Sequence, residues 1–400
     1  MRNLMEVDGG MNRSERGRGG CMQDIFLEKY GIDHRDGIVN RGELGRLRRC
    51  MERAAEGERL TIGFIGGSIT QGSLASAPEK CYAYRVFEWW GETFPDASFT
   101  YVNAGVGGTT SQFGVARVQE DLLQYEPDFV IVEFSVNDED EEHFAETYEG
   151  LVRRIYGSDS APAVVLVHNV RYDTGINAEN QHRKIGKAYK LPSVSMKPAI
   201  YAKVGEGKIA ARDITPDDLH PNDEGHALVA GVIRGFLGDV YAECAGKRDL
   251  QEQGTGSGGL PEAVTPNAYE QSVRYQNDNC DAECFGFEKD AENGNGNFRK
   301  GWTADKINDR IVFNIKGTEL AVQYRKSIHK PAPVARVTVD GDEENAHILD
   351  GNFDEDWGDC LYIDTIAERL ENKLHTIEIT VVESKEAVVP FYLVSVIGSQ

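Results

Sequence analysis

The sequence lacks any apolar run of the roughly 18 residues that a membrane-spanning helix requires. Its N-terminal stretch, Met1 to Gly20, is polar and rich in glycine and arginine, without the apolar middle of a secretory signal. The seven cysteines are scattered and odd in number, which suits a reducing cytoplasm better than a disulfide framework. We therefore expect a cytoplasmic protein without a membrane span.

Basic residues are also few. The 43 Lys and Arg residues are opposed by 66 Asp and Glu residues, which gives a formal net charge of −23. Such an acidic surface repels phosphate backbones and anionic lipids, so the charge argues against nucleic acid and membranes as partners. A neutral substrate, such as a sugar ester, meets no such barrier.

What the chain does have is enough length and apolar content for two domains. Its 400 residues exceed the usual size of one hydrophobic core, and 40% of them are hydrophobic. Composition and periodicity predict four parts: a disordered N-terminus at 1–23, an α/β domain at 24–248, a linker at 249–264 and a β-rich domain at 265–400.

The first domain begins with an amphipathic helix, predicted over Asn40 to Gly57 with Asn40 as N-cap and Gly57 as its end. Strands and helices then alternate. The expected strands are Leu60–Ile65, Phe99–Val102, Phe129–Phe134, Ala163–Val167 and Ser193–Met196, and the expected helices are Cys81–Phe94, Gln112–Gln124 and Phe144–Ile155. Continuous apolar strands separated by helices indicate a parallel sheet covered on both faces, so we predict a three-layer, flavodoxin-like α/β/α fold.

The second domain has a different sequence pattern. Gln251 to Leu260 contains a Gly-Thr-Gly-Ser-Gly-Gly run that is typical of a flexible linker. Alternating segments without helical periodicity follow at Arg310–Ile315, Glu319–Tyr324, Ala335–Val339, His375–Val382 and Phe391–Ile397. Short strands at this spacing predict an antiparallel β-sandwich.

Polar residues gather where the strands of the first domain end. Gly67-Ser68 follows the first strand, a glycine-rich turn at 105–110 follows the second, and Asn137-Asp138 follows the third, while Asp217 and His220 come late in the domain. Because ligands bind beyond the carboxyl ends of parallel strands, these loops share one rim. A hydroxyl, an amide and a carboxylate–imidazole pair suit acyl transfer.

Each residue type has a role in that chemistry. Ser68 would attack a carbonyl while His220 takes its proton, and Asp217 would orient the imidazole, with Asp218 as the competing carboxylate. The backbone N–H groups of Ser68 and Gly108 and the amide of Asn137 would form the oxyanion hole. Alone, Ser68 is more commonly a helix N-cap, and an Asx turn is an alternative role for Asn137, but their combination predicts catalysis.

These blocks resemble the SGNH/GDSL hydrolases over roughly residues 58–240. Gly66-Gly67-Ser68 stands where the family usually has Gly-Asp-Ser, so the acidic residue is absent, while Gly108, Asn137 and Asp217-x-x-His220 match the later blocks. The resemblance implies ester hydrolysis without metal or cofactor. Together with a C-terminal sandwich similar to carbohydrate-binding modules, it resembles intracellular esterases that deacetylate plant-derived oligosaccharides, such as acetylated mannan or xylan.

Three further residues are candidates for substrate contact. His168 follows the fourth strand on the same rim, and Trp302 and Trp357 of the second domain could stack on sugar rings. For all three, packing inside the core is the commoner role. Cys280 and Cys284 have ligand-like spacing, but no second pair follows, so no metal site is predicted.

The leading hypothesis is therefore a serine esterase that removes O-acetyl groups from oligosaccharides. One alternative is a lipase or thioesterase activity of the same triad on other acyl esters. A second alternative is a catalytically silent carbohydrate-binding protein. Whether the chain forms a homo-oligomer stays open.

Overall fold

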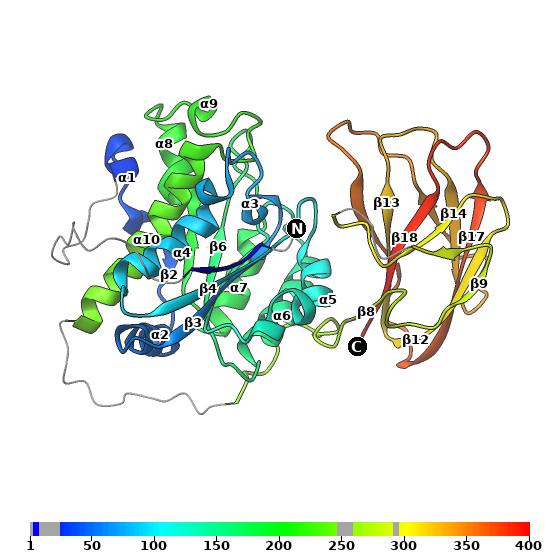
Figure 1. The fold of residues 1–400 in the computed structure, drawn as a ribbon, viewed down its shortest axis with the longest axis horizontal. Coiled ribbons are helices and arrows are strands. Elements are labelled where there is room, and N and C mark those ends of the chain that lie inside the picture. The colour runs from blue at the N-terminus through cyan, green and yellow to red at the C-terminus, as the bar shows by residue number, and fades with distance from the viewer. Residues whose placement is uncertain (1–2, 8–24, 246–258, 291–295) are drawn as a thin grey trace. The chain divides into compact units, whose positions relative to one another are not determined.

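The fold is described from a computed structural model, which defines residues 3–7, 25–245, 259–290 and 296–400 (Figure 1). They form two compact units, one containing nearly all described residues up to Pro266 and the other containing Asn267–Gln400. The two units belong to different fold classes.

The first unit is built on a seven-stranded sheet with the order β1-β4-β3-β5-β6-β7-β2. The five central strands run parallel, whereas β1 and β2 pair antiparallel at the two edges. The bounds are β1 Asn3–Val7, β2 Ile38–Asn40, β3 Arg59–Gly66, β4 Ser98–Gly105, β5 Phe129–Glu133, β6 Ala163–His168 and β7 Ser193–Ser195.

Helices cover both faces of this sheet, and Figure 1 shows α2, α4 and α10 on one face and α5 and α6 on the other. The α-helices are α1 Ile25–Tyr30, α2 Gly45–Ala55, α3 Ser68–Gln71, α4 Tyr82–Thr93, α5 Ser111–Asp121, α6 Glu142–Tyr156, α7 Glu179–Ala188, α8 Ala202–Gly205, α9 Ala211–Ile214 and α10 Asp223–Ala245. Short turns of other helix types lie at η1 His34–Gly37, η2 Pro78–Lys80, η3 Leu123–Tyr125 and η4 Lys197–Tyr201. The predicted three-layer α/β/α fold is confirmed.

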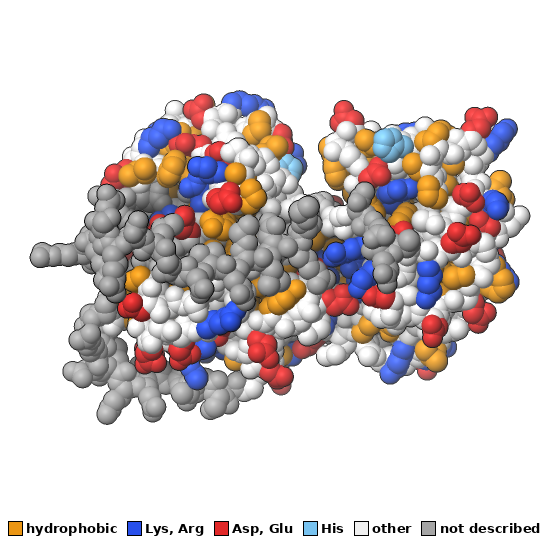
Figure 2. All heavy atoms as spheres, viewed as in Figure 1, with side chains coloured by type: hydrophobic (Ala, Val, Ile, Leu, Met, Phe, Trp, Pro, Cys, Tyr) orange, Lys and Arg blue, Asp and Glu red, His pale blue; other side chains and the backbone are white. Residues whose placement is uncertain are grey.

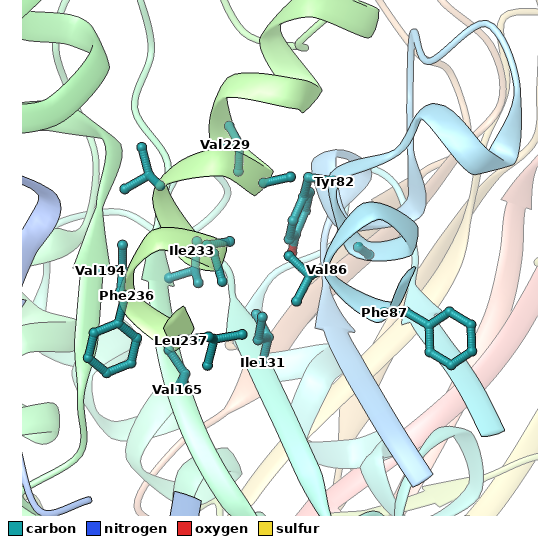
Figure 3. Close-up of a cluster of buried hydrophobic side chains, with 14 of the residues drawn as sticks. Tyr82, Val86, Phe87, Ile131, Val165, Val194, Val229, Ile233, Phe236 and Leu237 are labelled. Carbon is teal, nitrogen blue, oxygen red and sulfur yellow. The ribbon is translucent and has the colours of Figure 1, made fainter. Parts of the chain in front are cut away.

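The core under α4 and α10 explains why these helices lie where they do. Figure 3 shows their apolar side chains meeting those of the central strands. The buried contacts include Val86 of α4, Ile233 and Leu237 of α10, Ile131 of β5 and Val165 of β6. Each such side chain contributes about 1.5–3 kcal/mol on burial, so the layer fixes the strand ends that carry the polar loops.

The second unit is an antiparallel β-sandwich, as predicted. One sheet has the order β10-β11-β18-β13-β16 with β8 paired to β18, and the other has the order β15-β14-β17-β12-β9. The strands are β8 Val273–Tyr275, β9 Glu283–Phe285, β10 Glu288–Lys289, β11 Trp302–Ala304, β12 Arg310–Gly317, β13 Glu319–Lys326, β14 Val334–Val339, β15 His347–Asp350, β16 Cys360–Ala367, β17 Lys373–Glu383 and β18 Phe391–Ser399. Alternating residues of both sheets, such as Phe313, Ile377 and Leu393, are buried between them.

Several local predictions need correction. The first sheet is mixed rather than purely parallel, because β1 and β2 flank it. Within the N-terminus predicted to be disordered, Asn3–Val7 forms a strand, while 8–23 lies outside the described residues. Asn40 does not cap a helix: it ends β2 and its side-chain amide donates to Leu191 O at 2.8 Å, and α2 starts only at Gly45.

The linker prediction lies partly outside the described residues, at 249–258. At its far end the chain is held by a buried carboxylate. Glu149 of α6 accepts hydrogen bonds from Val264 N and Thr265 N, both at 2.8 Å. This segment is therefore anchored to the first unit rather than free of it.

On the face shown in Figure 2, carboxylate side chains are interspersed with basic ones and do not gather into one patch. None of the described helices is long and apolar enough to cross a membrane.

Candidate active site

Ser68 lies at the sharp turn between β3 and α3. The strand β3 is apolar and buried over most of its length, and it ends at Gly66. Gly67 then leads into Ser68, the first residue of the short helix α3, which places the hydroxyl at the carboxyl edge of the sheet. A Cβ at Gly66 would meet Glu133 O at 2.4 Å, so glycine is needed where the chain turns against β5.

The loop between α9 and α10 brings His220 to this hydroxyl. His220 Nε2 lies 2.8 Å from Ser68 Oγ, although the two residues are 152 positions apart in sequence. On the other side of the ring, Nδ1 lies 2.6 Å from Asp217 Oδ2. Since a carboxylate only accepts, Nδ1 carries the proton and Nε2 is left to accept from the serine hydroxyl.

Asp217 is itself held firmly by the backbone of its own loop. Its Oδ1 accepts from Leu219 N at 3.0 Å and from His220 N at 2.7 Å. Partial burial opposes ionisation, but the hydrogen bonds from the His220 ring and these N–H groups outweigh it, so the pKa of Asp217 is lowered below its usual value. The carboxylate therefore stays charged and fixes the imidazole tautomer.

The competing carboxylate has a different partner. Asp218 Oδ2 accepts from Arg212 Nη2 at 2.6 Å, and its backbone has a positive φ of 64°. The geometry therefore selects Asp217 as the partner of His220, as the spacing predicted.

The expected oxyanion donors lie around the same turn. Gly108 has a positive φ of 68°. A Cβ added to the preceding residue, Gly107, would lie 3.5 Å from Ser68 Cβ, so this glycine-rich turn packs directly on the nucleophile. Asn137 follows β5, and its side chain lies against Gly67, beside Ser68. The structure thus brings together the hydroxyl, the imidazole, the carboxylate and the predicted donor residues.

Two of the three predicted substrate contacts do not fit the structure. His168 is fully buried at the end of β6, where burial lowers its pKa well below the usual value, and it has no surface to offer a ligand. Trp302 of β11 is also fully buried, with its ring at 5.2 Å from that of Phe313 in the sandwich core. Trp357 differs, because 57% of its surface is exposed.

Sequence reasoning missed a buried polar layer beneath the rim. Tyr82 OH lies 2.8 Å from Thr70 Oγ1, which donates to Glu133 Oε2 at 3.4 Å, and all three residues are fully buried. Burial raises the pKa of Glu133 to about 7. The signal that could have found it is a carboxylate at the end of an otherwise apolar strand.

His226 of α10 has a structural role. Its Nε2 donates to Ser73 O at 3.1 Å and its Nδ1 accepts from Tyr82 N at 3.3 Å. Burial lowers its pKa to about 4, so the ring is neutral at physiological pH. It links the segment after the nucleophile to the start of α4.

The next feature is the distribution of metal-binding side chains in the described part of the chain. No group of three or more His, Cys, Asp and Glu side chains is arranged there to hold an ion. Cys280 and Cys284 are both free thiols.

Comparisons with known proteins point to the same region and extend beyond it. The sequence model of the GDSL-like lipase/acylhydrolase family matches residues 64–228, which contain Ser68, Asp217 and His220. A solved two-domain esterase (CEX) active on acetylated mannans is 55% identical with a TM-score of 0.88, and the match covers 92% of this chain and 99% of that chain.

The same esterase co-crystallised with mannopentaose is 55% identical, with a TM-score of 0.87 and coverage of 92% and 98%. Thioesterase 1/protease 1/lysophospholipase L1 of Escherichia coli (strain K12) is 24% identical over 188 residues, which are 44% of this chain and 82% of that protein. The mannan-active esterase is thus matched along nearly its whole length.

Proposed function

Because the chain belongs to the GDSL-like lipase/acylhydrolase family, the SGNH hydrolases, we propose that it is a serine esterase that removes acetyl groups from mannan-derived oligosaccharides. The observation that carries the proposal is the hydrogen-bonded series Asp217–His220–Ser68, assembled from two loops far apart in sequence. The two-domain relatives active on acetylated mannans supply the substrate class.

In the proposed reaction, Ser68 Oγ attacks the acetyl carbonyl carbon while His220 Nε2 takes the hydroxyl proton. Asp217 stabilises the resulting imidazolium. The tetrahedral oxyanion accepts hydrogen bonds from the backbone N–H groups of Ser68 and Gly108 and from the Asn137 amide.

Collapse of this intermediate breaks the bond to the sugar oxygen, which takes the proton from His220 and leaves as a free hydroxyl. Water then attacks the acetyl-serine with His220 again as base. Acetate departs, and the Ser68 hydroxyl is restored. One ester and one water thus yield one sugar hydroxyl and one acetic acid.

The alternative on the same residues is hydrolysis of longer acyl chains, as in a lipase or thioesterase. A series of aryl esters of increasing acyl length distinguishes acetyl removal from hydrolysis of longer acyl chains. Preference for a two-carbon over an eight-carbon acyl group supports acetyl removal, and the reverse preference supports the alternative.

The proposal includes a glycan contact by the second unit at Trp357. Its ring is exposed and is held edge-on to Phe353 at 5.0 Å, and an aromatic face of this kind can stack on a sugar ring. Trp357→Ala should weaken binding of mannopentaose to the Ser68→Ala protein, as measured by calorimetry. Unchanged affinity would remove Trp357 from the proposal and leave the triad untouched.

The central test is acetate release from acetylated mannan oligosaccharides by wild type and by Ser68→Ala. The variant should fold normally and lose roughly 10⁴- to 10⁶-fold in kcat, because the nucleophile is gone. Ser158→Ala, which removes a hydroxyl at the end of α6, is the matched control and should keep full activity. Equal turnover by Ser68→Ala and wild type would end the proposal.

We also retain a cytoplasmic location as part of this proposal. It is supported by the cysteines of the described residues, all of which are free thiols. Treatment with a reductant should then leave activity and stability unchanged, because no disulfide joins the cysteines of the described residues.

A further inference from the structure

Gly67 departs from the family's usual block, in which an acidic residue precedes the serine. Its φ of −88° is one that every L residue adopts, but its ψ of −148° lies outside the main regions of L residues, so the backbone itself favours glycine here. The space around Gly67 gives a second reason.

That space is occupied by Asn137. A Cβ on Gly67 would lie 2.1 Å from Asn137 Oδ1, 2.8 Å from its Cγ and 3.2 Å from its Nδ2. These three nearest atoms all belong to the end of one side chain. At Gly105, by contrast, a Cβ would lie 2.2 Å from the backbone nitrogen of Gln71, which cannot move without shifting α3.

The Asn137 amide has little else to hold it in place. Its Oδ1 is buried and accepts no hydrogen bond within the described part of the chain. Only the backbone is fixed, by a hydrogen bond from Asn137 N to Phe134 O at 3.0 Å. The orientation of the amide therefore depends on packing, and the surface of Gly67 is part of that packing.

We propose that Gly67 is a positioning residue for the oxyanion hole: by leaving the volume of a Cβ free, it lets the Asn137 amide lie beside Ser68. This rests on the proposed esterase function, in which Asn137 donates to the oxyanion. An added methyl group would displace the amide, because the clashing atoms end a side chain. The same displacement would remove a donor from the transition state.

A double-mutant cycle tests this. The variants are Gly67→Ala, Asn137→Ala and the double variant, with kcat and KM measured on an aryl acetate and unfolding followed in urea. Asn137→Ala should lower kcat about 10²- to 10³-fold, the usual loss of one oxyanion donor. Gly67→Ala should lower kcat at least tenfold with little change in KM, and the double variant should be no slower than Asn137→Ala alone.

Gly91→Ala in α4 is the matched control, because nothing lies within 4 Å of the Cβ it would add, and it should keep wild-type kcat. If the losses at positions 67 and 137 multiply in the double variant, or if Gly67→Ala keeps wild-type kcat while Asn137→Ala is slow, the inference is wrong. Full activity in both Asn137→Ala and Ser68→Ala would instead count against the proposed function itself.

Stability gives a second readout, which applies even if Gly67→Ala folds poorly. Should Gly67→Ala lower the urea midpoint, the added Asn137→Ala change should restore it, because it removes the clashing Cγ, Oδ1 and Nδ2 atoms. A double variant as unstable as Gly67→Ala would mean that the methyl group meets something other than Asn137, and the inference would fail.

Discussion

Two aspartate–histidine pairs of the first unit contain the same chemical groups but have different roles. In Asp217–His220 the side chains keep 45% and 24% of their surface exposed, and the contact is 2.6 Å. In Asp138–His182 both side chains are fully buried, and the contact is 3.0 Å. The first pair lies at the rim of the sheet and the second lies beneath it.

The second nitrogen of each ring makes the difference. His220 Nε2 meets the Ser68 hydroxyl, whereas His182 Nδ1 is buried with no hydrogen-bond partner among the described residues. The His182 ring instead stacks flat on Tyr148, with centroids 3.6 Å apart. An aspartate–histidine pair is thus reactive only where the free nitrogen meets a nucleophile that solvent and substrate can reach.

Asp138 also ties segments of the chain together. Its Oδ1 accepts from Ser111 N at 2.8 Å, at the first residue of α5, while its Oδ2 faces His182 of α7. The buried pair therefore supports the loop that carries Asn137 and the helix that follows the Gly108 turn. We expect loss of the rim pair to reduce activity and loss of the buried pair to reduce stability.

The largest effect is expected for Asp217→Asn. The amide would face His220 Nδ1 with an N–H group and favour the wrong imidazole tautomer, so kcat should fall by about 10³- to 10⁴-fold while the urea midpoint changes little. The neighbouring variant Asp218→Asn is the control, since that carboxylate binds Arg212 instead. If both variants lost activity equally, the assignment of Asp217 to the imidazole would not hold.

Asp138→Ala should have the opposite signature. It leaves the His182 ring and Ser111 N buried without their acceptor, which should lower the free energy of unfolding by about 3–5 kcal/mol in urea titrations. Asp173→Ala removes a carboxylate from an exposed pair with Arg171 and should cost under about 1 kcal/mol. Equal stability of these two variants would contradict a supporting role for the buried pair.

The sequence predicted the rim pair and not the buried one for a physical reason. Asp217 and His220 are three residues apart, and a tight loop suffices to join them. Asp138 and His182 are 44 residues apart, and their contact depends on how α7 docks. The helix α7 escaped prediction because few of its residues are apolar, and it buries polar side chains such as Gln181 and His182 instead.

The same limit applies to the predicted substrate contacts. The ends of the apolar runs in the sequence mark the carboxyl edge of the sheet. Ser68 and Asn137 could therefore be placed near each other from the sequence alone. The local pattern could not tell an exposed tryptophan from a buried one. Trp302 pairs across β11 and β18 and faces the core, whereas Trp357 lies in a loop between β15 and β16. Only the packing of the two sheets decides which ring is free.

The smallest of these effects concerns Glu133, a carboxyl in the buried layer to which no histidine among the described residues is hydrogen-bonded. Its pKa is raised from 4.5 to about 7, so the folded protein holds a proton that the unfolded chain releases between these pH values. Its contribution to stability is therefore present below pH 4.5 and is lost as pH rises to about 7, by about 3 kcal/mol at 1.36 kcal/mol per pKa unit. His226, with a pKa lowered to about 4, contributes stability that rises with pH over much of this range, and this masks the effect of Glu133 in wild type.

The variant Glu133→Gln isolates the contribution of Glu133. The unfolding free energy of the variant minus that of wild type should increase by about 3 kcal/mol between pH 4.5 and 7 and then level off. A difference that stays constant over this range would mean that Glu133 is ionised over the whole range, as Asp217 is at the rim, and the raised pKa would be refuted.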